Sequence, residues 1–134
     1  MDRRTFHRFA LAGLFGATVG RTAQAETAVD YSTVTTRSLA ENLVKQGRLE
    51  TIFLFPPELG GEDRPENRAW VPAGTGQAQA LIIGTLTRYL EDDLIDQLEV
   101  EPSYRGKSFV PIRIRYVARH STKSGVFSPT LEIW

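Results

Sequence analysis

The chain has no cysteine among its 134 residues, and this absence excludes several kinds of chemistry. No disulfide can form, so stability must come from burial and hydrogen bonds alone. Thiolate zinc sites, iron–sulfur clusters, cysteine nucleophiles and CxxC haem attachment are excluded for the same reason. We therefore expect no cofactor.

Histidine is nearly as scarce, since His7 and His120 are the only two. His7 falls in the N-terminal leader described below, which leaves His120 alone in the mature domain. A two-histidine metal site within one subunit is therefore excluded. No nucleophile-elbow motif accompanies Ser121 or Ser124, so we interpret His120 as a surface or strand-end residue rather than a general base. The sequence does not decide whether the protein is an enzyme, and on balance it favours a non-enzymatic role.

The chain also lacks an apolar run long enough to cross a membrane. Residues 9–19 form an apolar run of 11 residues, whereas a spanning helix needs roughly 20. Basic residues precede this run, and the small residues Ala23 and Ala25 follow it, which is typical of a cleavable signal peptide. We place the cleavage after Ala25, so that residues 1–25 are removed and no permanent membrane anchor remains.

The beginning of this leader resembles a twin-arginine (Tat) signal. Arg3, Arg4 and Phe6 match the family pattern Ser/Thr-Arg-Arg-x-Phe-Leu-Lys, while Asp2 and His7 depart from it. An ordinary secretory signal with two adjacent arginines is the alternative. The resemblance implies that the Tat translocase and signal peptidase are partners during export, and that the mature protein is periplasmic or secreted.

Residues 26–134 have the length of a single small domain. The whole chain has 16 basic and 16 acidic residues; the leader holds four of the basic ones and one acidic one, which leaves 12 against 15, or a net charge of −3. Generic nucleic-acid binding depends on clustered cations that neutralise phosphates. We therefore expect no nucleic-acid partner.

Hydrophobic periodicity predicts two helices and several strands. Thr36 would cap a helix over residues 37–46 that ends at Gly47, with Ser38 as an alternative cap, and Thr75 would cap a longer helix over residues 76–92. The near-continuous apolar run of residues 49–55 favours a central strand covered on both faces. Further strands are expected over residues 69–72, 98–101, 108–120 and 130–134. We predict an α+β fold with a mainly antiparallel sheet of four to five strands and two helices packed on one face.

Three arginines could bind an anionic ligand or an acidic partner. Arg113, Arg115 and Arg119 share one face of a predicted strand because side chains alternate with a period of two. The structural alternative is cross-strand pairing, in which Glu101 lies opposite Arg113 and Glu99 lies opposite Arg115. We favour the structural reading for these two arginines, and Arg119 has no obvious partner.

The long loop over residues 56–68 is rich in acids and turn formers. Glu58, Glu62, Asp63 and Glu66 flank a pair of glycines and could offer oxygen ligands to a hard cation, but their spacing matches no EF-hand loop. We interpret this loop as solvated and as the preferred binding edge of the domain, because long loops often carry function.

Aromatic residues divide into core and candidate anchors. We expect Tyr104, in a turn, to be less easily buried, so that it could anchor a partner. Trp134 could do the same or could pack as a lid on the core. The simplest interpretation places the others in the core, namely Phe53, Phe55, Trp70, Phe109, Tyr116 and Phe127.

The segments FPPELGGEDRPEN, WVP, YRGKSFVP and EIW look like those of a group of small uncharacterised bacterial α+β proteins. Some of that group lie near polymorphic toxin systems and are suspected of immunity-like partner binding. No motif in the group has an assigned role to carry over. We hypothesise an exported, non-enzymatic protein that binds an unknown protein partner. The more specific form of this hypothesis is an immunity-like role. A small periplasmic hydrolase or an accessory subunit of a secreted enzyme is the alternative.

Overall fold

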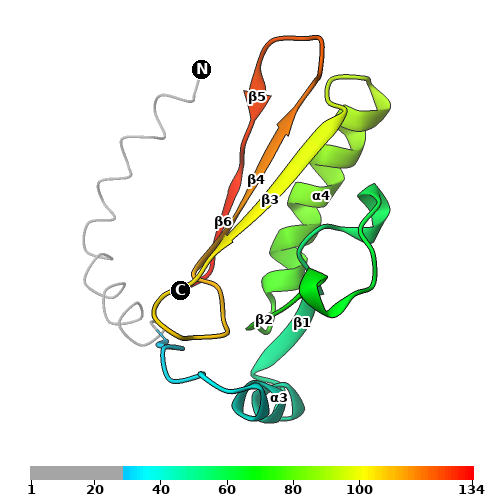
Figure 1. The fold of residues 1–134 in the computed structure, drawn as a ribbon. Helices are drawn as coiled ribbons and strands as arrows, with labels where there is room; N and C mark the ends of the chain where they lie inside the picture. Colours follow the sequence, from blue (N-terminus) through cyan, green and yellow to red (C-terminus); the bar gives the residue numbers. More distant parts are fainter. Residues whose placement is uncertain (1–28) are drawn as a thin grey trace, which may run out of the picture. The chain divides into compact units, whose positions relative to one another are not determined.

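The structure, a computed structural model, describes residues 29–134, and Tyr31–Trp134 fold together as one unit (Figure 1). The signal-motif residues Arg3, Arg4 and Phe6 and the cleavage residues Ala23 and Ala25 lie outside the described residues. Of the helices that are described, none has the length and apolar character needed to cross a bilayer.

The described residues form two α-helices and two antiparallel sheets. Helix α3 spans Arg37–Lys45 and helix α4 spans Thr75–Glu91. A two-stranded sheet joins β1 (Leu49–Phe53) to β2 (Arg68–Pro72). In the second sheet, β4 (Arg113–Arg119) pairs with β3 (Gln97–Ser103) and with the two short strands β5 (Val126–Phe127) and β6 (Thr130–Glu132). The predicted α+β class with antiparallel pairing is confirmed.

Helix α3 begins and ends where the sequence predicts. The Thr36 side chain accepts a hydrogen bond from the backbone N–H of Leu39 at 3.1 Å, which satisfies one of the free donors at the helix start. After the helix, Gly47 has a φ of +75°, a left-handed conformation that glycine adopts without a steric penalty.

The predicted cap of α4 is wrong. Thr75 is already the first helical residue, and Gly74 before it has no side chain that could cap the helix. Glu50 of β1 supplies the acceptor instead: its carboxylate accepts from the backbone N–H groups of Gly74 at 3.2 Å and Gly76 at 2.7 Å. A carboxylate at this end also interacts favourably with the helix dipole. A partner this distant in sequence gives no local signal.

Strand β1 is not the central strand that its apolar run indicates, since in the described sheets it pairs only with β2. Its two faces contact different neighbours. Ile52 joins the core cluster that contains Leu86 of α4, whereas Leu49 joins the cluster that contains Ala40 of α3. Thr51, on the same face as Leu49, is exposed. Residues 49–55 are mainly apolar because α3 packs on one face of β1 near Leu49 and α4 packs on the other face near Ile52.

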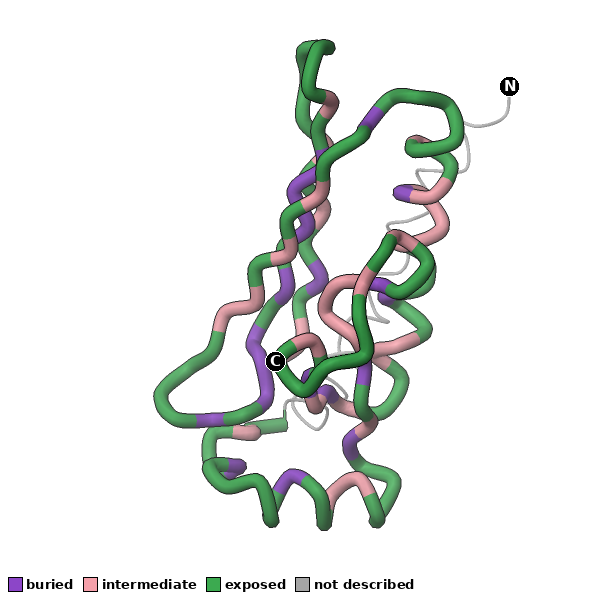
Figure 2. Tube along the Cα trace, turned by 45° about the vertical axis from the view of Figure 1, so that its right-hand side comes forward, coloured by how far each residue is buried: buried purple, intermediate pink, exposed green. Residues whose placement is uncertain are grey.

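The larger core lies between α4 and the four-stranded sheet. Leu86 of α4 and Ile114, Tyr116 and Ala118 of β4 are fully buried there (buried positions are purple in Figure 2). Burial on this scale provides most of the free energy that holds a small domain together.

A smaller core lies under α3, and Trp134 packs against it. The indole N–H of Trp134 donates to the backbone carbonyl of Val110 at 3.0 Å. Its ring packs on Tyr31 in a T-shaped arrangement with a centroid distance of 5.9 Å. These contacts support the interpretation of Trp134 as a lid on the core.

One buried polar side chain connects the two sheets through α4. The side-chain amide of Gln79, which is 6% exposed, donates to the backbone carbonyl of Phe53 in β1 at 2.8 Å and to the hydroxyl of Tyr116 in β4 at 2.9 Å. Burial raises the pKa of Tyr116 above its ordinary value, so this phenol stays neutral.

We predict that Gln79→Ala lowers the free energy of unfolding by about 1–3 kcal/mol, because it leaves buried acceptors without their donor. Gln77→Ala is the matched control, since Gln77 is exposed on the same helix and should change stability by less than about 0.5 kcal/mol. Urea unfolding followed by circular dichroism measures both. Equal effects in the two variants would contradict a special role for Gln79.

Candidate functional site

The three arginines of β4 share an exposed face, as predicted, because Ile114, Tyr116 and Ala118 alternate with them and are buried. The predicted pairing is wrong by two residues. The register places Glu101 opposite Arg115 and Glu99 opposite Val117. The reason is that β3 continues to Ser103, whose carbonyl accepts from the backbone N–H of Ile112, so the connection begins later than predicted.

Two of these arginines are ion-paired across the sheet. Arg115 lies 3.4 Å from Glu101 on β3, and Arg113 lies 3.4 Å from Glu132 on β6. Both pairs are exposed, so each contributes little to stability. For Arg119, the part of the chain that the structure describes contains no ion-pair partner. The structural reading of Arg113 and Arg115 thus holds with different partners.

The loop over residues 56–68 has a defined conformation built around Asn67. It contains two short 3-10 helices, η2 (Pro57–Leu59) and η3 (Pro65–Asn67). The Asn67 side chain donates to the backbone carbonyls of Phe55 and Glu62, both at 2.9 Å, and accepts from the Phe55 N–H at 2.7 Å. A Cβ at Gly61 would lie 1.9 Å from the Phe55 carbonyl oxygen, so only glycine fits this approach.

The acids of this loop interact mainly with arginines of the same loop. Glu62 lies 3.1 Å from Arg64, and Asp63 pairs with Arg68. Glu58 lies exposed in the first turn of η2. Among the described residues, no group of three or more acids and histidines is placed to hold a metal ion. These ion pairs join parts of the loop to one another.

His120 lies at the end of β4 and belongs to a local polar cluster. Its Nδ1 accepts the backbone N–H of Thr122 at 3.1 Å, which makes the ring the Nε2–H tautomer, and Nε2 lies 3.0 Å from a carboxylate oxygen of Asp93. The side chain is only 9% exposed, so the expectation of a strand-end position is met but the ring is not on the surface. Both ring nitrogens are engaged in holding the turn.

Two aspartates in this cluster are stabilised in their charged form. The hydrogen bond to His120 lowers the pKa of Asp93, and the hydroxyl of Ser121, which donates to Asp96 at 2.7 Å, lowers the pKa of Asp96. Asp93 also adopts a φ of +59°, an uncommon conformation for a residue with a side chain. The cluster fixes the start of β3 against the turn that follows β4.

Trp70 lies at the margin of the smaller core and is only partly buried, whereas the sequence predicts a position in the core. Ala69 and Val71 alternate with it and are buried towards α4, so the Trp70 side chain points to the opposite face of β2. Its ring stacks on Phe109 with a centroid distance of 5.9 Å and an interplanar angle of 8°. The guanidinium carbon of Arg37 lies 5.4 Å from the ring centroid, within the range of a cation–π contact.

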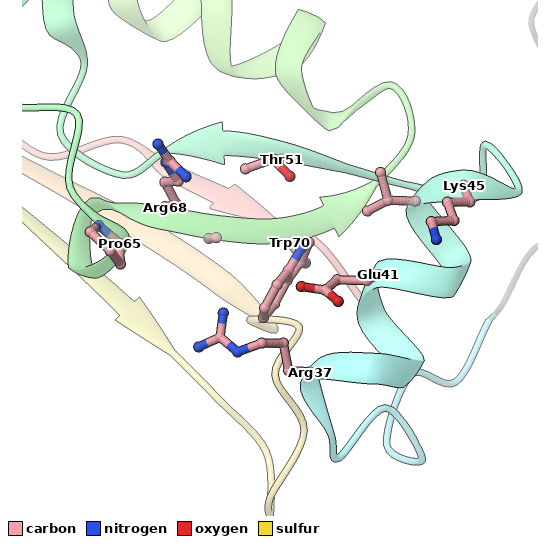
Figure 3. A pocket seen from close by; sticks show the side chains of 9 residues that line it. Arg37, Glu41, Lys45, Thr51, Pro65, Arg68 and Trp70 are labelled. Carbon is pink, nitrogen blue, oxygen red and sulfur yellow. The ribbon is translucent and has the colours of Figure 1, made fainter.

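A first groove, with a volume of about 500 Å³, runs beside Trp70 (Figure 3). Arg37, Glu41 and Lys45 line it from successive turns of α3, because their spacing of four places them on one face of the helix. Thr51 and Trp70 line it from the two-stranded sheet. The groove thus combines an aromatic ring with charged side chains, and cations outnumber acids.

A second groove, of about 420 Å³, shares Arg68, Ala69 and Trp70 with the first. Its remaining side chains come from the connection between β3 and β4, and they include Tyr104, Lys107 and Phe109. We call the two grooves together the Trp70 surface.

A buried serine fixes the connection that carries these side chains. The hydroxyl of Ser108 donates to the backbone carbonyl of Tyr31 at 2.8 Å and accepts the N–H of Val110 at 3.1 Å. The backbone N–H of Phe109 donates to the carbonyl of Val34 at 2.8 Å. The position of Phe109 beside Trp70 is thereby set by the backbone.

The structure brings one of the predicted binding residues to the Trp70 surface and leaves the others elsewhere. Tyr104 lines the second groove with its side chain 46% exposed, and partial burial raises its pKa. Asp63 lines neither groove, although it pairs with Arg68, which lines both. The remaining predicted residues line neither groove, namely Glu58, Glu62, Arg113, Arg115 and Arg119.

Sequence reasoning missed Arg37, Lys45 and Trp70 as surface residues. The sequence did contain signals for them. Trp70 alternates with Ala69 and Val71, so its side chain lies on the other face of the strand, and the spacing of Arg37 and Lys45 places them on one face of a helix. Comparison of the chain with protein-family models, curated proteins and solved structures finds no match.

We predict that Asp96→Asn reduces stability at neutral pH and that its deficit shrinks in acid. The lowered pKa of Asp96 means that its contribution is complete above its ordinary value of 3.8 and is lost as the pH falls through the lower folded-state value. Thermal unfolding from pH 7 to pH 2 measures this. Asp92→Asn, four residues away at the exposed end of α4, is the control. An Asp96→Asn deficit that does not change with pH would refute the prediction.

Proposed function

We propose that this chain is an exported, non-enzymatic protein whose mature part, residues 26–134, binds another macromolecule through the Trp70 surface. Export would use the twin-arginine leader, with cleavage after Ala25 and delivery to the periplasm or the exterior. The observation that carries the binding proposal is the stack of Phe109, Trp70 and Arg37 at the margin of two grooves.

The composition of this surface supports a role in partner binding. Tryptophan, tyrosine and arginine are the residues that most often dominate the binding energy of protein interfaces. Trp70, Tyr104 and Arg68 all line the second groove, and Phe109 beside them is 37% exposed. The segment behind them is held by the buried Ser108, so the surface is preorganised, which lowers the entropic cost of binding.

The position of His120 favours binding over hydrolysis. A general base acts on a substrate held beside it, and His120 lines neither groove of the Trp70 surface. Its Nδ1 contacts the N–H and the hydroxyl of Thr122, and its Nε2 faces Asp93. We therefore rank the periplasmic hydrolase, or an accessory subunit of a secreted enzyme, below the binding protein.

An immunity-like role is the sharper version of the proposal. It rests on the resemblance of segments around Phe55, Trp70 and Tyr104 to a group of small bacterial proteins, some of which lie near toxin systems. Two of these residues, Trp70 and Tyr104, line the second groove. In this role the partner would be a toxin that acts in the compartment to which the chain is exported.

We expect that replacing both Arg3 and Arg4 with lysine abolishes export. The resemblance to a Tat signal implies that the Tat translocase recognises this arginine pair. Fractionation of cells expressing the wild-type chain should give a periplasmic or secreted product whose first residue is Glu26. Recovery of a cytosolic product that still begins with Met1 would contradict the proposal.

We predict that the exported protein, used as bait in periplasmic extract, captures a partner that mass spectrometry identifies as a toxin or another defined macromolecule. Tyr104→Ala should reduce the capture about tenfold or more, as expected for an interface hot spot. Leu81→Ala is the matched control, because Leu81 is 77% exposed and lines neither groove.

The same experiment separates binding from catalysis. If the chain is a binding protein, His120→Ala should retain capture as long as its circular dichroism is unchanged. Equal losses in Tyr104→Ala and Leu81→Ala would remove the Trp70 surface from the proposal. Loss of function in folded His120→Ala alone would favour the hydrolase.

A further inference from the structure

We propose that the partner presents an acidic segment with an apolar side chain to the Trp70 surface. This inference rests on the proposed function as a binding protein and specifies the chemistry of the bound segment.

Charge on the Trp70 surface is opposite in sign to that of the mature chain. Arg37, Lys45, Arg68 and Lys107 line the two grooves, and Glu41 is the acid among the lining residues. The mature chain carries 12 basic and 15 acidic residues, so a cationic groove is a local feature that the overall charge does not explain. Such a patch attracts anionic partners and repels cationic ones.

Several of these cations are available to a ligand. Arg68 is paired with Asp63, but in the region covered by the structure neither Lys45 nor Lys107 has an ion-pair partner. Arg37 is held over the Trp70 ring, which orients its guanidinium without neutralising it. Carboxylates on a partner would therefore form pairs that replace no existing one.

The grooves also require an apolar group between the charges. Val44 and Trp70 line the first groove, and Phe109 lines the second. A ligand that carried only carboxylates would leave these apolar surfaces in contact with water. An apolar side chain flanked by acids matches a lining that combines cations with aromatic rings.

Nucleic acid fits this surface less well than an acidic protein segment. The Trp70 ring is already stacked on Phe109, which reduces the free aromatic area on which a base could stack.

The test uses a fluorescein-labelled peptide of glutamates with one central leucine and the exported protein, measured by fluorescence anisotropy. Wild type should bind this probe, and Lys45→Gln and Lys107→Gln should each weaken binding about threefold to tenfold. Added salt should weaken it further, because exposed charge pairs are screened. Arg88→Gln removes the same charge from exposed α4, outside both grooves, and should leave the affinity unchanged.

Three outcomes would overturn the inference. One is an equal loss of affinity in Arg88→Gln and Lys45→Gln, which would indicate a general charge effect. The second is binding of a single-stranded oligonucleotide more tightly than the peptide. The third is capture of a periplasmic partner that Lys45→Gln and Lys107→Gln do not change, in which case the binding function stands and the acidic segment does not. By contrast, failure of wild type to capture any partner would count against the proposed function itself.

Discussion

The two hydrogen bonds donated by the Gln79 amide are the interaction on which the arrangement of this fold depends. The two sheets are separate ladders, and α4 lies against both of them. Apolar packing holds these layers together, but burial itself is non-directional and constrains their relative placement less sharply than a hydrogen bond does. A buried amide that must reach the Phe53 carbonyl and the Tyr116 hydroxyl at once specifies the placement, since any other would leave polar groups unsatisfied.

The Trp70 surface follows from this placement. Once Ala69 and Val71 of β2 are directed towards α4, alternation forces Trp70 to the other face. There the ring is only partly covered, by Phe109 and Arg37. A tryptophan kept half-buried at such a margin costs some hydrophobic stabilisation, which is why its position favours a role in contact with something else.

The sequence predicted what depends on local order and missed what depends on distant partners. Thr36 and Gly47 define α3 through interactions within a few residues, and both were correctly predicted. The alternation of β4 was also correct, yet its register was off by two residues, because a shift of two leaves every side chain on its face and the local pattern cannot detect it. Among the residues of the candidate site, Tyr104 was predicted from the sequence. Arg37 and Lys45 were missed, because the periodicity of α3 indicates which residues form its apolar face and gives no role to the charged residues outside it.

The Glu50 carboxylate at the start of α4 has a consequence for how the chain folds. A helix whose first turn lacks its own cap is weak in isolation, and nucleation of a helix is costly. Here the missing acceptor arrives only when β1 is already in place, because Glu50 belongs to that strand. Helix α4 and the β1–β2 pair therefore stabilise each other when they come together. A chain in which only one of them had formed would lack this interaction, and that element would be less stable.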